Sequence, residues 1–212
     1  MDPALEAQLV RGAARLGVAL DARTRTAFSR YLALLLRWNA RIKLTSVVEP
    51  AAVVEKHFLD ALAMVPAVRG ADSLVDVGSG AGFPGAVVAL VEPSIQVVLV
   101  ESIQKKAAFL EALRRELPLP NATVLADRME RLVAERRRFA AAVSRATFAP
   151  AEWIAHGRDL VAPGGCLVAF VVPAPGDTAA TYAPDGETHF GSAELSPYTA
   201  GRALVILRDR RT

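Results

Sequence analysis

The sequence predicts an α/β fold: a Rossmann-like, mostly parallel sheet with helices on both faces, preceded by an N-terminal helical extension. Strand-like and helix-like segments alternate from about residue 73 onward, which implies right-handed crossovers between parallel strands. The residues before that point look helical throughout. We therefore expect a helical extension over 1–68 packed on a Rossmann-like domain over 69–212, the two forming one structural unit.

The extension should contain three helices. Apolar residues at helical spacing predict the first helix, which Gly17 ends: Leu5, Leu9, Ala13 and Leu16. Asp21 is placed to cap a second helix. The buried stripe of that helix would include Phe28, Tyr31, Leu32, Leu35 and Trp38. Pro50 suits the first turn of a third helix, which would reach about Met64.

The main domain should contain five strands followed by a last one. We expect strands at 73–77, 96–101, 122–126, 139–144 and 165–172, separated by helices at 84–92, 103–117, 128–135 and 150–161. A Pro-Gly-Gly turn at 163–165 leads into the fifth strand. Residues 173–186 resemble a loop, and 203–208 a final strand, plausibly antiparallel at the sheet edge.

Composition narrows the class of protein. The chain has 212 residues, 52% hydrophobic and 22% charged, which is a globular composition. No apolar run approaches the roughly 20 residues that span a bilayer, and the N-terminus does not resemble a signal peptide. Cys166 is the only cysteine and the three histidines are scattered, so we expect no metal site. We expect a cytoplasmic monomer without a membrane partner.

Residues 74–85 carry the strongest functional signal. An apolar run ends in Asp76, and glycines follow at Gly78, Gly80, Gly82 and Gly85 before a helix-like segment. Such a strand, tight turn and helix N-terminus point backbone N–H groups at a ligand, and a Cβ would keep a nucleotide off the main chain. The pattern predicts a nucleoside-containing ligand.

Two acidic residues bear on which nucleoside binds. Asp76 would repel the pyrophosphate of NAD but suits the cationic centres of S-adenosylmethionine. Glu101 ends the second strand, where its carboxylate can accept hydrogen bonds from both ribose hydroxyls of either cofactor. We favour S-adenosylmethionine, and the late start of the glycine loop in the chain agrees with it. Met129 is placed to pack on the adenine, although the simpler interpretation of this segment is that Asp127 caps the helix that follows.

Several segments together resemble one family, the bacterial 16S ribosomal RNA guanine-N7 methyltransferases, also called glucose-inhibited division protein B. These segments occupy 38–46, 56–62, 75–85, 100–106 and 143–146, and the resemblance spans roughly residues 5–172. It implies a class I S-adenosylmethionine-dependent methyltransferase with a seven-stranded sheet. It also implies that the substrate is 16S ribosomal RNA of the small ribosomal subunit, methylated at a guanosine of the 530 loop.

The resemblance also assigns roles to residues. It implies that Gly78 and Phe83 contact the cofactor, and we add Asp76 and Gly80 from the loop. Around the ribose and adenine it places Glu101, Ser102, Ile103, Met129 and Glu130. Arg145 would lie beside cofactor and substrate, and Arg128 matches a further basic position. We therefore name Arg145 and Arg128 as catalytic candidates, with a salt bridge from Arg145 to Glu101 or Asp127 as the alternative for Arg145.

Guanine N7 carries a lone pair and no proton, so direct in-line transfer of the methyl group would need neither a general base nor a metal. Proximity and alignment would then provide most of the catalysis. Arginine reads the acceptor edge of guanine well, and we expect contact with O6 or a phosphate rather than N7. Asn39, Thr45, His57 and Asp60 match motif positions of the family, for which we favour a structural role with a His57–Asp60 pair.

Two features leave the substrate open. Residues 1–43 hold eight arginines and lysines against three acids, which is compatible with phosphate contacts, although plain surface charge is the reading we favour. The family also usually has a lysine followed by glycine near its end, whereas the segment at 169–173 has no basic residue. The alternatives are a methyltransferase for a small molecule or protein, or a non-catalytic RNA-binding relative.

Overall fold

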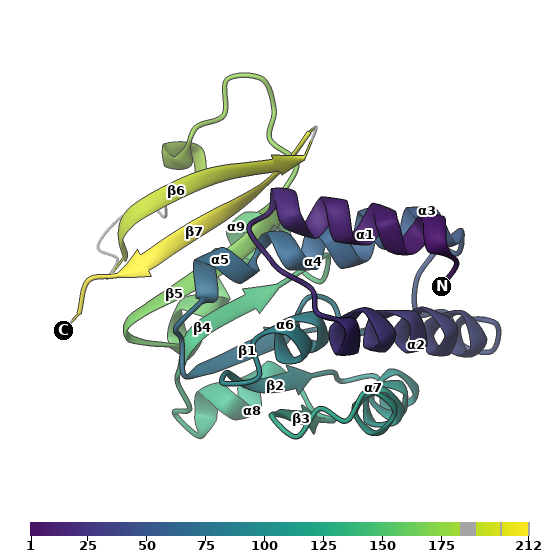
Figure 1. The fold of residues 1–212 in the computed structure, drawn as a ribbon. Helices are drawn as coiled ribbons and strands as arrows, with labels where there is room; N and C mark the ends of the chain where they lie inside the picture. Colours follow the sequence, from purple (N-terminus) through teal and green to yellow (C-terminus); the bar gives the residue numbers. More distant parts are fainter. Residues whose placement is uncertain (183–189, 200, 212) are drawn as a thin grey trace.

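A seven-stranded sheet runs through the centre of the described chain, with strand order β3-β2-β1-β4-β5-β7-β6 (Figure 1). The computed structural model describes residues 1–182, 190–199 and 201–211. The strands are β1 (Ser73–Val77), β2 (Gln96–Val100), β3 (Ala122–Leu125), β4 (Phe139–Ser144), β5 (Val161–Val171), β6 (Phe190–Thr199) and β7 (Arg202–Asp209). Strands β1 to β5 pair in parallel, and β7 is antiparallel to both β5 and β6. The expected seven-stranded α/β fold is confirmed.

Helices connect the parallel strands as expected. They are α6 (Gly85–Val91), α7 (Gln104–Glu116), α8 (Met129–Ala134) and α9 (Pro150–Gly157), and α9 continues into the 3-10 turn η2 (Arg158–Leu160). A second 3-10 turn, η3 (Ala179–Tyr182), lies in the segment expected to be loop; residues 183–186 of that segment lie outside the described residues.

The second N-terminal helix begins at its predicted cap, Asp21, and the first has a cap that was not predicted, Asp2. Helix α1 (Pro3–Arg15) starts after Asp2, and α2 (Ala22–Asn39) starts after Asp21, whose carboxylate accepts the Thr24 N–H at 2.7 Å. The predicted third helix is three consecutive pieces: α3 (Pro50–Val53), the π-helix η1 (Val54–Leu59) and α4 (Asp60–Ala63). A separate short helix, α5 (Val65–Val68), leads into β1.

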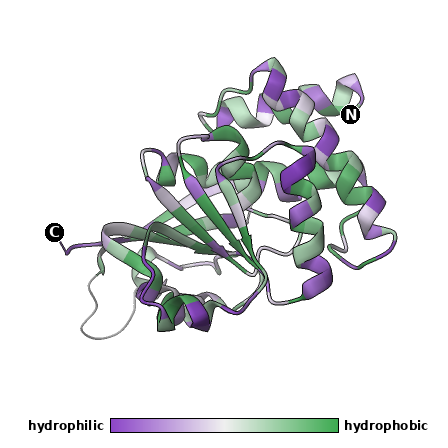
Figure 2. Cartoon of the chain, turned by 90° about the horizontal axis from the view of Figure 1, so that it is seen from below, coloured by the Kyte–Doolittle hydropathy of each residue, from purple (hydrophilic) through white to green (hydrophobic). Residues whose placement is uncertain are grey.

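Successive strand residues point to opposite faces of the sheet, and each face has its own core. Leu74 packs with residues of the N-terminal helices, α6 and α7, whereas Val75 and Val77 pack with α8 and α9. Figure 2 shows the strands largely in the hydrophobic colour between helices of mixed colour. The extension therefore completes one of the two hydrophobic layers.

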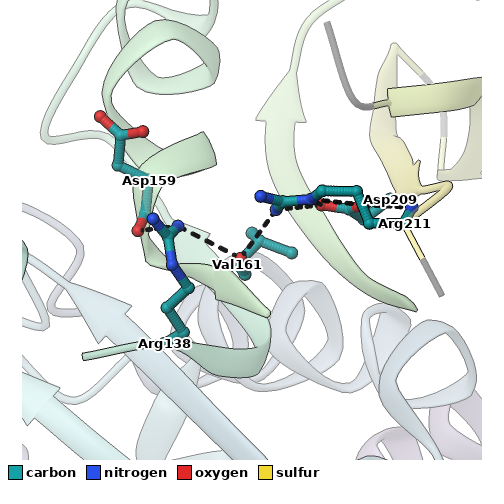
Figure 3. Close-up of polar contacts among 5 residues, drawn as sticks. All are labelled: Arg138, Asp159, Val161, Asp209 and Arg211. Carbon is teal, nitrogen blue, oxygen red and sulfur yellow. Dashed lines mark hydrogen bonds and ion pairs between the residues drawn. The ribbon is translucent and has the colours of Figure 1, made fainter. Parts of the chain in front are cut away.

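The start of β5 differs from the prediction. The strand begins at Val161 rather than 165, and its register with β4 shifts between Phe139 and Ala141. The Pro-Gly-Gly segment is thus an irregularity inside the strand, with Gly164 at φ 73°. Arg138 and Arg211 both donate to the Val161 carbonyl, at 3.5 and 3.2 Å (Figure 3).

The end of the chain also differs. The last strand is antiparallel, as expected, but it lies between β5 and β6 and is not the edge strand. Strand β6 was not predicted. Its sequence includes Gly191 and Pro197, and a register shift lies between Pro197 and Thr199. Proline is tolerated there because β6 forms the edge of the sheet.

Candidate functional site

The candidate site lies at the carboxyl ends of the parallel strands. The chain runs from β1 to β2 and β3 on one side and then crosses to β4 on the other. In sheets of this kind ligands bind where the strand order reverses, here between β1 and β4. The glycine loop follows β1 and Arg145 follows β4, so the structure places both at this point.

Three of the loop glycines are required by neighbouring protein atoms. A Cβ on Gly78 would collide with Thr147, and a Cβ on Gly82 would lie 2.5 Å from the Tyr31 hydroxyl. A Cβ on Gly85 would collide with side chains of β1 and β2. Glycine at these positions allows the close packing of the loop. It also allows the positive φ of Gly78 (73°) and Gly82 (87°).

Gly80 is different. It has φ 54°, and a Cβ built on it would meet only the Gly78 carbonyl oxygen at 3.7 Å and a Glu101 oxygen at 4.0 Å. The space beside its Cα is therefore open towards the predicted ribose-binding carboxylate. That opening is a surface on which a nucleoside can lie against the main chain, and it fits the expected cofactor.

Glu101 organises the rim of this opening. One carboxylate oxygen accepts the Gly80 N–H at 2.9 Å, and the other accepts the Ile103 N–H at 2.8 Å. The side chain is buried, whereas Ser102 and Ile103 are exposed. Each carboxylate oxygen has a second lone pair, so Glu101 can still accept from two ribose hydroxyls while it holds the loop.

Asp76 is fully buried at the end of β1. Its Oδ2 accepts the Gly85 N–H at the start of α6 at 2.9 Å, while its Oδ1 has no hydrogen-bond partner. Burial raises the pKa of this carboxyl to about 6, and the Gly85 N–H opposes the rise. An unpartnered buried carboxylate oxygen next to a ligand loop suits a cationic donor, which agrees with S-adenosylmethionine.

The segment after β3 borders the site on the other side of β2. Met129 is buried, whereas Arg128 and Glu130 are exposed. Asp127 accepts the Arg128 N–H at 2.7 Å and pairs with Arg131 at 3.0 Å. The N-cap residue of α8 is Arg128, without a side-chain cap, so Asp127 does not cap the helix as the sequence suggested. The Arg128 side chain contacts no acid in the part of the chain that the structure describes.

The two arginines named from the sequence are not brought together. Arg128 follows β3 and Arg145 follows β4, and two strands separate these strands in the sheet. Three strand spacings amount to roughly 14 Å. The two guanidinium groups therefore face different parts of any substrate.

Phe83 lies in an aromatic stack that joins the loop to the extension. Its ring is parallel to that of Tyr31, with centroids 5.1 Å apart, and stacks on His57 at 4.9 Å. The Tyr31 hydroxyl donates to the Ala81 carbonyl at 2.7 Å. Phe83 is only 3% exposed, so most of its surface contacts protein.

Arg145 completes this stack. Its guanidinium carbon lies 5.3 Å from the Phe83 ring centroid, and the side chain is 14% exposed. It donates to the Lys56 carbonyl at 3.1 Å and lies 3.6 Å from the Asp60 carboxylate. Burial lowers the pKa of the guanidinium, and Asp60 opposes that effect.

The structure contradicts two pairings considered from the sequence, the alternative one for Arg145 and the favoured one for His57. Arg145 pairs with Asp60 rather than with Glu101 or Asp127. His57 does not pair with Asp60 either: its Nε2 lies 2.8 Å from the Thr45 hydroxyl and its Nδ1 lies 3.1 Å from Arg145. The π-helical turn changes the helical spacing on which the expected pair depended.

Three residues at the site were missed. Tyr31 was assigned only to a buried stripe, but its hydroxyl holds the glycine loop. Arg202, from β7, forms a close ion pair with Asp60, and Tyr198 of β6 interacts with the same two charges. No local signal marks Arg202, because it reaches the site only through the antiparallel placement of β7 beside β5.

The described residues (1–182, 190–199 and 201–211) offer neither a metal-binding cluster nor a membrane-spanning helix. They contain no group of three or more His, Cys, Asp or Glu placed to hold a metal ion. His189 lies outside these ranges. None of their helices has the length and apolar character needed to cross a membrane.

Known proteins resemble the chain over most of its length. A family model described as rRNA small subunit methyltransferase G matches residues 24–174. The ribosomal RNA small subunit methyltransferase G of Burkholderia multivorans is 43% identical over 187 residues, covering 86% of this chain and 82% of that protein. The protein of the same name from Anaeromyxobacter dehalogenans is 40% identical over 174 residues, covering 81% and 80%.

A solved structure shares the fold. An O-methyltransferase from Bacillus cereus in complex with SAH superposes with a TM-score of 0.58 at 15% identity, covering 84% of this chain and 90% of that one. Three findings lead to the same conclusion: the glycine loop, the acids at the carboxyl ends of β1 and β2, and the family match over more than half of the chain. The chain therefore belongs to the rRNA small subunit methyltransferase G family, and it is an enzyme that takes its methyl group from S-adenosylmethionine.

Proposed function

We propose that this protein methylates N7 of a guanosine in the 530 loop of 16S ribosomal RNA. The observation that carries the proposal is the position of Arg145: a buried guanidinium at the reversal of strand order, beside the glycine loop. Arginine is suited to the acceptor edge of guanine, and the relatives that match the chain are named for ribosomal RNA of the small subunit.

The residues around the glycine loop have different roles in binding the cofactor. Bound S-adenosylmethionine supplies an electrophilic methyl group on its sulfonium centre. Gly80 gives the nucleoside access to the main chain, and Glu101 accepts the ribose hydroxyls. Asp76 faces the charged amino acid part, while Met129 and the neighbouring Glu130 border the adenine. Phe83 holds the loop against the N-terminal extension through its stack with Tyr31.

Arg145 holds the guanine in line with the methyl group. Because N7 has no proton to lose, the protein does not need a general base, and alignment provides most of the rate. The guanidinium contacts O6 or a flanking phosphate, which leaves the N7 lone pair free. Arg128, roughly 14 Å along the sheet edge, contacts the RNA backbone instead.

The N-terminal extension provides further phosphate contacts. Among its eight basic residues up to Lys43, Arg25 pairs with Glu6 at 3.0 Å. The other seven are exposed and pair with no acid within the described residues: Arg11, Arg15, Arg23, Arg30, Arg37, Arg41 and Lys43. Exposed unpaired arginines of this kind release counterions on RNA, so binding should weaken steeply with salt. We further propose that the enzyme acts in the cytoplasm as a monomer.

The test is mass spectrometry of 16S ribosomal RNA from cells with and without the protein. We expect loss of one 7-methylguanosine from the 530 loop, and its return when the purified protein and S-adenosylmethionine are added to small subunits. An unchanged RNA would contradict the proposed substrate and favour a small molecule or protein instead. Arg145→Ala should reduce the added activity at least about 100-fold, as expected when an aligning contact is lost.

A further inference from the structure

Asp60 connects the site to two different strands. Its Oδ2 forms a close ion pair with Arg202 at the start of β7 and lies 3.6 Å from the Arg145 guanidinium at the end of β4. The Asp60 side chain is 7% exposed. Burial raises the pKa of this carboxyl and the two arginines lower it, so the charged form depends on both partners.

Arg145 is fixed in one direction. Its guanidinium carbon lies over the Phe83 ring, and its Nη1 donates to the Lys56 carbonyl at 3.1 Å. A largely buried cation needs such partners, because a buried charge without a partner is strongly destabilising. Asp60 is the acid that stands within ion-pair distance of Arg145 among the described residues.

His57 supports the same side chain as a neutral group. Arginine can only donate, so the His57 Nδ1 atom, 3.1 Å from the guanidinium, accepts, and Nε2 carries the proton towards the Thr45 hydroxyl at 2.8 Å. In this tautomer the 2.9 Å approach of Nδ1 to the Lys56 carbonyl is not a hydrogen bond. Thr45 is itself held by Asn39, which accepts its N–H at 2.9 Å.

We propose that Asp60 is a positioning residue for methyl transfer: its carboxylate holds the Arg145 guanidinium beside the glycine loop, with the neutral ring of His57 as a second support. Both residues come from the π-helical turn and its junction with α4, and such turns are frequent at functional sites. The helical extension thereby takes part in catalysis as well as packing. This inference rests on the proposed role of Arg145.

A purely structural role would look different. In that case Asp60 would serve only Arg202, tying β7 to the extension, and its removal would affect stability without acting through Arg145. The two roles are separable because they couple Asp60 to different arginines.

The experiment is a pair of double-mutant cycles on the full-length enzyme with small subunits as substrate. We expect Asp60→Asn to lower kcat about tenfold with little change in S-adenosylmethionine affinity, because a misaligned contact costs rate rather than cofactor binding. In the Arg145→Ala background the same change should alter kcat less than about twofold, because a residue acting through Arg145 has nothing left to position. Glu55→Gln, an exposed acid one turn earlier, is the matched control.

The second cycle pairs Asp60→Asn with Arg202→Met and measures unfolding by denaturant. Two results together would overturn the proposal. The first is that Asp60→Asn and Arg202→Met are coupled in their effect on the free energy of unfolding. The second is that Asp60→Asn lowers kcat by the same factor in the wild type and in Arg145→Ala. His57→Leu provides an independent arm that removes the neutral acceptor, together with the Thr45 hydrogen bond and the ring stack on Phe83. If His57 acts through Arg145, kcat should fall in the wild-type background but not with Arg145→Ala. If Arg145→Ala alone leaves turnover unchanged, the proposed function of Arg145 fails instead.

Discussion

The glycines of the loop have different surroundings: protein atoms crowd Gly78, Gly82 and Gly85, whereas Gly80 faces open space. A substitution at Gly80 should therefore affect ligand binding more than packing. Gly80→Ala places a methyl group in space that no protein atom fills. We expect a loss of about 1–2 kcal/mol of stability from the left-handed backbone, together with a large loss of S-adenosylmethionine affinity by calorimetry.

Gly17→Ala is the control for that change. Gly17 has φ 72° and also has nothing near its missing Cβ, but it lies between α1 and α2, away from the strand ends. It should show the same backbone cost and normal cofactor affinity. Equal affinities for the two variants would remove Gly80 from the cofactor site.

Asp76 predicts a pH dependence of cofactor binding. Its pKa in the protein is about 6, and a cationic ligand would lower it, so binding below pH 6 must release a proton. Affinity for S-adenosylmethionine should therefore rise as the pH increases to about 6 and level off above it. Asp76→Asn should bind more weakly, and titration calorimetry should show that this pH dependence has disappeared. A wild-type affinity that is flat between about pH 5 and 7 would contradict the assignment.

At the residue scale the sequence predicted that Asp76 and Glu101 lie at the ends of their strands, whereas it did not predict the partners of Arg145. Asp76 and Glu101 are local to their strands, so motif spacing places them correctly. The partners of Arg145 come from positions 56, 57 and 60, which approach it only after the extension packs on the sheet. Side-chain spacing along a helix could not reveal that contact.

Among the elements, α2 makes a polar contact with the glycine loop that its hydrophobic pattern did not suggest. Tyr31 reaches the glycine loop from this helix and donates to the Ala81 carbonyl. Tyr31→Phe keeps the stack on Phe83 but leaves a buried carbonyl unsatisfied, which costs about 1–3 kcal/mol. We expect a lower melting temperature and weaker S-adenosylmethionine binding.

Tyr198→Phe is the comparison, because it removes a tyrosine hydroxyl that lies near Asp60 and Arg202 rather than at the loop. It should leave cofactor affinity unchanged. If Tyr31→Phe also binds the cofactor normally, α2 contributes packing alone.

The elements that the sequence missed are those whose form depends on their neighbours. Strand β6 is rich in small residues and contains proline, yet its edge position beside β7 tolerates both. The π-helical turn has no separate sequence pattern, because its apolar residues also suit an ordinary helix. In contrast, the apolar spacing of α1 and α2, the stop at Gly17 and the cap at Asp21 are local signals, and they predicted both helices.

For the whole molecule we propose a single cooperative unit. Residues of α1 and α2 share one hydrophobic cluster with residues of β1, β2, β4 and β5. The two tryptophans report on different parts: Trp38 lies in α2, and Trp153 lies in α9 on the other face. In Trp153→Phe and in Trp38→Phe, we expect the fluorescence of the remaining tryptophan and the far-UV circular dichroism to report the same unfolding midpoint.

Different midpoints for the two fluorescence signals would mean that the extension unfolds as a separate domain. Each variant is compared with its own far-UV transition, since Trp153 also donates a buried hydrogen bond to the Val168 carbonyl at 2.8 Å. Coincident transitions would establish the single unit that the sequence suggested.

The ion pair between Asp60 and Arg202 has a consequence for the order in which the enzyme becomes active during synthesis. It joins a residue near the start of the chain to one in its last strand. A ribosome completes the glycine loop and both cofactor acids long before it makes Arg202. Contacts of such separation in sequence are slow to form. We therefore expect a nascent chain to acquire cofactor binding first and full catalytic alignment only after release of the C-terminal strand.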